Sequence, residues 1–232
     1  MKFCSIIITH FGSSKERSEM MRESLKSLIA SLDYPSEVIV VDNGGVVAED
    51  STFFLKLITE GQIQLYIKNR NNMHFGYARN QGIKLAQGNY ICIVDNDLIY
   101  KKGWLSKCIH VLESHPDRKI YATPMLYPCS SQRYNAGSLE VDGVKHFLDM
   151  RAGSNCFVIR KKDLDKIGWF QYHRIAGSIW TTAATRAEYL ACILPERLVT
   201  DIGLKKGYNL KQVIPIELIL SDKSKVCFNQ DI

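Results

Sequence analysis

The first half of the chain alternates short β-rich runs with longer segments of helical periodicity, and this alternation restricts the fold more than any other feature. The strand-like runs lie near residues 2–9, 37–41, 62–68 and 90–94. Strands that alternate with helices in this way are typical of a parallel sheet covered on both faces. The pattern therefore predicts consecutive βαβ units that build one central sheet.

Helices are expected between these strands. The first should cover residues 15–32, because apolar side chains recur there at helical spacing: Met20, Met21, Leu25, Leu28, Ile29 and Leu32. The second and third are expected over 52–60 and 77–87, with Gly88 as the left-handed residue that ends the third. A fourth helix up to about Ser114, a break at Pro116 and a strand over 120–125 complete this half.

From about residue 134 the sequence pattern changes to short runs of residues separated by Gly and Asp. Strands are expected over 144–150 and 154–159, and helices over 162–167 and 181–193. Because no Pro/Ser/Gly linker separates the halves, the second should be a smaller α+β extension of the same sheet. We therefore expect one domain, 1–232, with halves 1–125 and 126–215 and a tail 216–232 of no assigned role.

Charge and cysteine usage narrow the function classes. The chain has 30 basic and 24 acidic side chains, a formal charge of +6, which suits an anionic ligand. No RNA-binding motif, zinc-finger pattern or long Lys/Arg run is present, so a nucleic-acid partner is not expected. The seven cysteines form no Cys-x-x-Cys pair; we interpret them as buried hydrophobes in a reducing, cytoplasmic protein.

Membrane insertion is not expected either. The apolar run at the N-terminus is too short for a secretory signal and reads as a buried strand. No uncharged apolar stretch approaches the roughly 20 residues that span a bilayer. The sequence predicts a cytoplasmic protein that is soluble or peripherally attached to the inner face of the membrane.

Polar residues follow each predicted strand of the first half. They are Thr9-His10, Asp42-Asn43, Asn69 to Asn72, and Asp95-Asn96-Asp97. Open α/β sheets bind ligands outside the carboxyl ends of their strands, so these groups should meet at one edge of the sheet. Turn formation is the alternative interpretation of each set, because Asp, Asn and Gly dominate turns for local backbone reasons.

The Asp95-Asn96-Asp97 sequence points to a metal ion and a phosphorylated ligand. Two carboxylates at i and i+2 repel each other, and a bound divalent cation relieves that repulsion. Hard oxygen ligands suit Mg²⁺ or Mn²⁺, which keep open positions for phosphate oxygens. The alternative is an Asp-rich turn without metal. Neither G-x-G-x-x-G nor a P-loop is present, which disfavours the two glycine-rich phosphate sites.

The order and spacing of these motifs over about the first hundred residues resemble the family 2 glycosyltransferases of the GT-A fold. The matching segments are Ser5-Ile6-Ile7-Ile8-Thr9, Val40-Val41-Asp42-Asn43, Asn69-x-x-Asn72-x-x-Phe75-Gly76-Tyr77-Ala78-Arg79-Asn80-Gln81-Gly82, and Gly88-Asn89-Tyr90-x-x-x-x-Asp95-Asn96-Asp97. A looser likeness continues from Arg151 to Phe170, on the acceptor side. The resemblance implies a Rossmann-like three-layer αβα sandwich with a mostly parallel central sheet.

Roles for individual residues follow from the same resemblance. It implies that Thr9 and His10 flank the nucleoside and that Asp42 accepts a hydrogen bond from the base. Arg79 would help to hold the donor, although by itself it reads as a solvated helix charge. The remaining donor contacts would come from Asn72, Asp95 and Asn96. Asp97 would be the principal metal ligand, with Asp95 contacting ribose or sugar directly or through the metal's waters.

The implied reaction moves a sugar from a nucleotide-diphosphate donor, such as a UDP-sugar, to a hydroxyl of a glycan or glycolipid. Inversion in one displacement needs a general base. The family carries an acidic pair where this chain has Ile179-Trp180. A non-catalytic relative or partner subunit, or a retaining transferase, would tolerate that change.

Weak alternatives for the base are Glu188, Asp201, Glu140 and Asp142. Asp201 stands where relatives often carry a metal-binding His, so it could also be a third metal ligand or a turn residue. Trp180 could stack on a sugar ring, but a large aromatic at helical spacing is more often part of a core.

Overall fold

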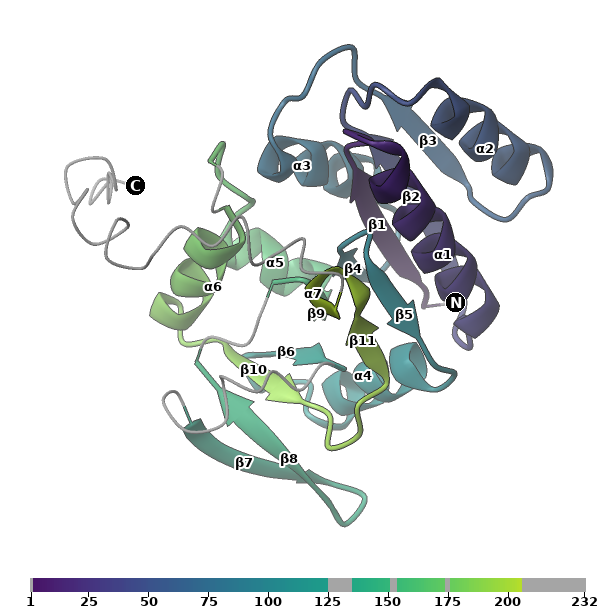
Figure 1. Cartoon of the computed structure of the whole chain (residues 1–232). Coiled ribbons are helices and arrows are strands. Elements are labelled where there is room, and N and C mark those ends of the chain that lie inside the picture. Colours follow the sequence, from purple (N-terminus) through teal and green to yellow (C-terminus); the bar gives the residue numbers. More distant parts are fainter. Residues whose placement is uncertain (1, 125–134, 151–153, 174–175, 206–232) are drawn as a thin grey trace.

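The computed structural model describes residues 2–124, 135–150, 154–173 and 176–205 (Figure 1). The strands are Cys4–His10 (β1), Ser36–Asp42 (β2), Leu65–Lys68 (β3), Tyr90–Val94 (β4), Leu98–Tyr100 (β5), Ile120–Thr123 (β6), Asn135–Val141 (β7), Val144–Asp149 (β8), Cys156–Arg160 (β9), Leu190–Ile193 (β10) and Val199–Asp201 (β11). The helices are Lys15–Ser31 (α1), Ala48–Thr59 (α2), Phe75–Leu85 (α3), Trp104–Ser114 (α4), Lys161–Ile167 (α5), Ala176–Arg186 (α6) and Ile202–Lys205 (α7).

Within the part of the chain that the structure describes, nine strands form one sheet in the order β3-β2-β1-β4-β9-β6-β10-β8-β7, which runs through both halves. β1 pairs in parallel with β2 and β4, and β2 with β3. β9 is antiparallel to β4 and β6, and β8 to β10 and β7, so every strand of this sheet except β8 and β9 points the same way. The expected mostly parallel α/β sheet is confirmed.

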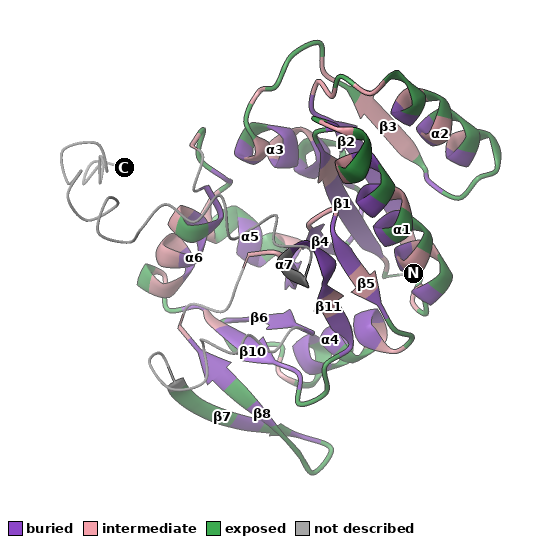
Figure 2. Cartoon of the chain, viewed as in Figure 1, coloured by how far each residue is buried: buried purple, intermediate pink, exposed green. Residues whose placement is uncertain are grey.

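Helices cover both faces of the sheet, and alternate side chains of each central strand enter different cores. Ile6 and Ile8 of β1 pack in the core built with α1, α2 and α4. Ile7 packs in the other core, with α3, α5 and α6. Figure 2 shows the resulting burial along β1 and β4. A strand with apolar residues on both faces is stable only between two such layers.

Two local features set the positions of α1 and α3. Ser14 caps α1 by accepting a hydrogen bond from the backbone N–H of Arg17 at 3.3 Å. Gly82 lets α3 approach β1 closely, because a Cβ there would lie 2.6 Å from Cγ2 of Ile7. Both helices follow loops at the carboxyl edge of the sheet, so their positions decide where side chains from their first turns lie.

Two expectations about local structure are wrong. Gly88 does not have a left-handed conformation, and α3 ends at Leu85. The reason for glycine at this position is steric, since a Cβ would lie 2.6 Å from the backbone nitrogen of Ser5. The expected helix over 181–193 is the second part of α6 followed by the strand β10. Leu190–Ile193 is extended because it pairs with β6 and β8, contacts that helical periodicity does not reveal.

Some expectations fall outside the described residues. They concern the tail 216–232, the end of the strand at Met125, the start of the acceptor-side segment at 151–153, and Cys129 and Cys227. The five cysteines within the described part, Cys4, Cys92, Cys108, Cys156 and Cys192, are free and buried. No helix in the described ranges is long and apolar enough to cross a membrane.

Adding a methyl group at Gly82 is predicted to destabilise the fold. The substitution Gly82→Ala forces α3 away from β1 or Ile7 out of its rotamer, and overpacking of this kind costs about 1–3 kcal/mol. Urea denaturation measures the loss in the free energy of unfolding. Lys84→Ala, at an exposed position of the same helix, is the control and should change that free energy by less than about 0.5 kcal/mol. Equal stability of the Gly82→Ala variant would contradict the close packing.

Candidate functional site

The parallel register of the central strands brings the predicted polar residues to one edge of the sheet. His10 at the end of β1 lies beside Asp42 at the end of β2. Ile8 lies beside Val94, so Asp95 follows β4 next to the last residues of β1. The strand ends that carry His10, Asp42 and Asp95 are therefore adjacent, as the sequence predicts.

Asp95 is held by a buried arginine. Nη2 of Arg79 lies 2.5 Å from Oδ1 of Asp95, and the backbone N–H of Asp95 donates to the carbonyl of Asn155 at 2.7 Å. The Arg79 guanidinium lies between two rings, 4.8 Å from the Phe75 centroid and 5.0 Å from the Phe170 centroid. Arg79 is 2% exposed, so its interpretation as a solvated helix charge is wrong. In the structure, Arg79 holds the carboxylate of Asp95 in place.

Asp97 lies deeper than Asp95 and close to a second arginine. It is 6% exposed, and its Oδ2 is 3.5 Å from Nη1 of Arg17 in the first turn of α1. Burial, followed by the nearby charges of Asp95 and Asp201, raises the pKa of Asp97 to about 7, while Arg17 opposes the shift. The turn thus contains a carboxyl group that is easily protonated when no cation is present.

A small second sheet places Asp201 near Asp95 and Asp97. β11 pairs antiparallel with β5, which places Asp201 opposite Leu98, one residue after Asp97. The backbone N–H of Ile202 donates to the carbonyl of Asp97 at 2.9 Å. Asp201 is 7% exposed and ends a strand, so its side chain belongs to the interior of the site and not to a surface turn.

The chemistry of these carboxylates fits a hard divalent cation. Asp95, Asp97 and Asp201 supply only oxygen donors, and the pKa of Asp97 rises partly because its carboxylate neighbours repel it. Within the described ranges, however, no three His, Cys, Asp or Glu side chains are gathered into a ready-made metal site. Arg17 and Arg79 instead pair with two of the three carboxylates. The metal site therefore stays a prediction.

Two hydrogen bonds hold the carboxylate of Asp42 at the end of β2. Its Oδ1 accepts a hydrogen bond from the backbone N–H of Gly45 at 3.0 Å, and its Oδ2 accepts one from the Tyr66 hydroxyl at 3.3 Å. Thr9 is half-buried one position before the end of β1. Asp42 itself is 2% exposed, so these contacts orient its carboxylate inside the edge of the sheet.

The loop between β3 and α3 is held by a network of amide side chains. Nδ2 of Asn43 donates to Oδ1 of Asn72 at 3.0 Å, and Oδ1 of Asn43 accepts from Asn69 at 3.1 Å. Asn69 and Gln81 exchange two further bonds. Asn72 is exposed, but its Oδ1 also caps the loop by accepting from the backbone N–H of His74. The network fixes the loop that Asn72 occupies.

His10 and Asn96 contact each other and do not line an open surface together. Nδ2 of Asn96 lies 2.7 Å from Nδ1 of His10. The other ring nitrogen of His10 lies 2.9 Å from Oδ2 of Asp50 in α2, and His10 is 2% exposed. A nucleoside contact from His10 therefore stays a prediction, whereas its contact with the turn after β4 is direct.

Of the two residues that stand in the place of the family's acidic pair, Trp180 belongs to the core and Ile179 is half-buried. Trp180 is 2% exposed and stacks on Phe157 with ring centroids 4.5 Å apart. Its indole N–H donates to the carbonyl of Gly168 at 3.0 Å. Trp180 is thus a core residue, as the frequency of buried aromatic residues suggested, and it leaves no carboxylate at this point of α6.

The weak base candidates other than Asp201 lie elsewhere. Glu188 follows α6 at φ +67° and pairs with Lys119 at 2.7 Å, on an exposed surface. Asp142 lies in the turn of the β7–β8 hairpin and pairs with His110 at 2.6 Å, and Glu140 is exposed on β7. Of the four candidates, only Asp201 lies near Asp95 and Asp97.

Comparisons with known proteins agree with this fold. The model of glycosyl transferase family 2 matches residues 5–189. The chain belongs to this family. Glucosyl-dolichyl phosphate glucuronosyltransferase of Haloferax volcanii is 25% identical over 119 residues, which are 50% of this chain and 36% of that protein. This family 2 chain therefore spans about a third of that relative.

Solved structures place the family 2 chain among GT-A glycosyltransferases. S. aureus TarS 1–349 in complex with UDP-GlcNAc matches with a TM-score of 0.60 at 21% identity, over 84% of this chain and 56% of that one. GalNAc-T7 with UDP, GalNAc and Mn²⁺ matches with a TM-score of 0.65 at 12% identity, over 84% of this chain and 43% of that one. The expected family and the GT-A fold are confirmed.

Sequence reasoning missed three residues of the site: Arg17, Asp50 and Tyr66. Arg17 and Asp50 lie in the first turns of α1 and α2, and Tyr66 lies on β3. Helix starts at the carboxyl edge of a parallel sheet point toward its ligand region, so charges in those turns were the available signal. The sequence reasoning considered only the motifs at strand ends, and these three residues are not part of those motifs.

The raised pKa of Asp97 predicts an unusual pH dependence of stability in the metal-free protein. Asp97 binds its proton more tightly in the folded protein than in the unfolded one. Its contribution to the free energy of unfolding is therefore full below the unfolded pKa of about 4 and is lost as the pH rises through about 7. In EDTA, the free energy of unfolding should fall by up to about 1.4 kcal/mol per pH unit between about pH 5 and 7.

Asp97→Asn should remove most of that slope, because the amide does not titrate. Urea denaturation of both proteins at several pH values in EDTA measures the effect, with Asp117→Asn at an exposed position as the control. Wild-type and Asp97→Asn curves with the same slope would show that Asp97 titrates normally.

Proposed function

We propose that this family 2 glycosyltransferase transfers a sugar from a UDP-linked donor to a hydroxyl of a glycan or glycolipid, in a metal-dependent and inverting reaction. The observation that carries the proposal is that Asp42, Asp95 and Asp97 lie at the carboxyl ends of the two strands that flank β1, with Asp201 close to Asp97. UDP or a UDP-sugar bound to two proteins of the same fold supports the choice of donor. The mild excess of basic side chains, +6, suits an anionic donor.

In this proposal the donor lies over the ends of β1, β2 and β4. Asp42 accepts a hydrogen bond from the base, with its carboxylate oriented by Gly45 and Tyr66. Thr9, His10 and Asn72 border the nucleoside, and Asn96 contributes to the turn that receives the diphosphate. Arg79 acts through Asp95, since its guanidinium is enclosed by Phe75 and Phe170.

Asp97, Asp95 and Asp201 would hold Mn²⁺ or Mg²⁺. Such an ion, when bound, stabilises the charge on the departing nucleoside diphosphate. The protein's own contribution is to keep the three carboxylates together despite their repulsion, and Arg17 and Arg79 offset that repulsion in its absence. Arg17, whose side chain is 23% exposed beside Asp97, would also meet the negative charge of a diphosphate.

The acceptor is expected to approach the half formed by residues 126–215, opposite the nucleotide half 1–125. We propose one domain in which the second half binds a glycan or glycolipid acceptor. A glycolipid acceptor would bring a cytoplasmic enzyme to the inner face of the membrane. Trp180 cannot contact a sugar from its position in the core.

A second candidate is a relative that binds the nucleotide sugar without transferring it, alone or as a partner subunit. The core position of Trp180 favours it, because the place of the family's base is filled by an indole. A retaining transferase would tolerate the same change. The anomeric configuration of the product, determined by NMR, separates inversion from retention, and binding without turnover across a panel of acceptors supports the non-catalytic candidate.

Asp97→Ala should abolish metal-dependent binding of UDP. Calorimetric titration of UDP with and without Mn²⁺ measures this, and we expect the Kd with Mn²⁺ to rise at least about tenfold, the equivalent of about 1.4 kcal/mol. Asp117→Ala, which removes an exposed carboxylate, should bind like the wild type. Unchanged binding by Asp97→Ala would refute the assignment of the metal to this turn.

Asp201→Asn distinguishes a metal ligand from a base. As a ligand, Asp201 supports Mn²⁺, so the Asn variant should need about ten times more Mn²⁺ for half-maximal UDP binding and should recover at saturating Mn²⁺. Loss of turnover with an unchanged Mn²⁺ requirement would instead make Asp201 the general base. Glu188→Gln, which removes a surface charge, is the matched control.

A further inference from the structure

A buried chain of hydrogen bonds connects the turn after β4 with helix α2. Asn96 Nδ2 lies 2.7 Å from His10 Nδ1, and His10 Nε2 lies 2.9 Å from Asp50 Oδ2. The side chains of His10 and Asp50 are 1% and 2% exposed. Three elements distant in sequence, β1, α2 and the turn, are therefore joined through a single imidazole.

Asp50 is fixed at the outer end of this chain by two residues of α1. The Ser18 hydroxyl donates to Oδ2 of Asp50 at 2.5 Å, and Nη2 of Arg22 donates to Oδ1 at 2.9 Å. Burial works against the charge of Asp50, but the hydrogen bonds from His10, Ser18 and Arg22 outweigh it and lower its pKa. Asp50 is therefore ionised, and an ionised carboxylate can only accept hydrogen bonds.

The partners of His10 then determine its tautomer. Because Asp50 only accepts, Nε2 of His10 must carry a proton. Asn96 presents its amide NH₂ to the other ring nitrogen, so Nδ1 has to be an unprotonated acceptor. In this arrangement Nε2 donates to Asp50 and Nδ1 accepts from Asn96. The same bond occupies the amide nitrogen of Asn96 and leaves its carbonyl oxygen as the acceptor for a ligand.

We propose that Asp50 and His10 are positioning residues that set the orientation of the Asn96 amide in the donor-binding turn. Asn96 stands between Asp95, which Arg79 holds, and Asp97, whose carbonyl is bound by Ile202. The side chain of Asn96 is oriented by His10 of β1 and, through His10, by Asp50 of α2. The functional part of this inference rests on the proposed function, because it assumes that the turn binds the donor.

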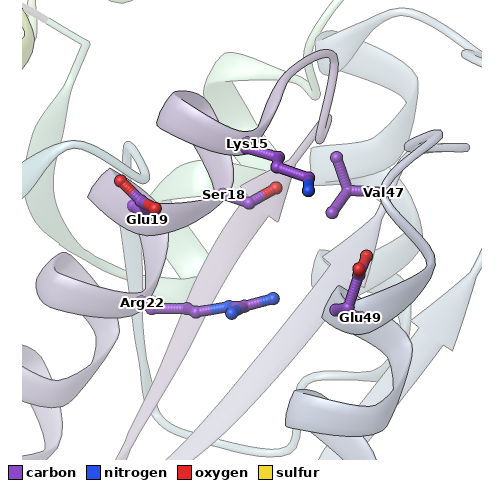
Figure 3. A pocket seen from close by; sticks show the side chains of 6 residues that line it. All are labelled: Lys15, Ser18, Glu19, Arg22, Val47 and Glu49. Atoms are coloured by element: carbon purple, nitrogen blue, oxygen red, sulfur yellow. The ribbon is translucent and has the colours of Figure 1, made fainter.

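A purely structural role is a poorer explanation of this arrangement than a positioning role. Apolar side chains of similar shape would fill the space at little cost, whereas each buried polar group must be paired. Both ring nitrogens of His10, both carboxylate oxygens of Asp50 and the Ser18 hydroxyl are paired, and the network ends on Asn96, a half-buried residue of the site. Ser18 and Arg22 also line a pocket between α1 and α2 together with Lys15, Glu19, Val47 and Glu49 (Figure 3). The outer end of the chain thus lies beside this pocket, and the inner end lies at the site.

The first test reads the tautomer directly. Long-range ¹H–¹⁵N correlation spectra of the wild-type protein at pH 7 should show one histidine that is neutral, with Nε2 protonated and Nδ1 unprotonated. Loss of this signal in a His10→Gln variant assigns it. A protonated Nδ1 at His10, in either the other neutral tautomer or the imidazolium, would overturn the proposal.

The second test compares two substitutions that each preserve one end of the imidazole. His10→Asn can place an oxygen where Nδ1 accepts from Asn96, and His10→Gln can place an amide N–H where Nε2 donates to Asp50. Both lose one buried hydrogen bond, so both should lower the melting temperature similarly. UDP binding with Mn²⁺ should weaken about tenfold in His10→Gln and by less than about threefold in His10→Asn, because only the former releases Asn96.

His110→Gln is the matched control, since it makes the same substitution at an exposed histidine that pairs with an aspartate. It should bind UDP like the wild type. Equal weakening of binding in both His10 variants would overturn the positioning role and leave only a structural one. Absence of UDP binding by the wild type would refute the proposed function and the functional part of this inference, while the tautomer measurement would still decide whether the hydrogen-bond chain exists.

Discussion

The parallel pairing of β1 with both β2 and β4 is the constraint on which the site depends. It aligns the ends of three strands within one edge, so that residues separated by more than eighty positions, such as His10 and Asn96, come into contact. The pairing is stable because alternate side chains of β1 enter different hydrophobic cores, one on each face. The packing of the two helical layers therefore also positions the strand ends that carry the site.

Charge is concentrated at this edge and balanced within it. Burial and the charges of Asp95 and Asp201 disfavour the ionised form of Asp97, and Arg17 beside it offsets part of that cost, while Arg79 pairs with Asp95. In the proposed function this edge would accept both a cation and a diphosphate. The pairing with Asp95 also explains why Arg79 is enclosed by two aromatic rings: a rigid guanidinium orients Asp95 better than a solvated one would.

The acceptor side differs from the donor side in how far it follows the family pattern. Trp180 packs against Phe157, Phe170 and Tyr121, so the helix that carries an acidic pair in the family contributes to the core of this chain. At the carboxyl edge of the sheet, the described residues include the aspartates that the sequence predicts as ligands. In the proposed function donor binding and transfer would therefore be separable, and the two candidate functions would differ in whether a base is supplied from elsewhere.

Apart from the short strand β5, the order of strands and helices in the first half could be predicted from the sequence, and so could the strand-end motifs and the family, because hydrophobic periodicity and short motifs are local properties. Tertiary structure decided that Leu190–Ile193 is a strand, that Arg79 is buried, and that Asp50 supports His10. Each of these depends on a partner distant in sequence, which periodicity cannot identify. The sequence by itself determined which side chains reach the edge of the sheet, and only the packing of helices against that edge decided which of them face one another.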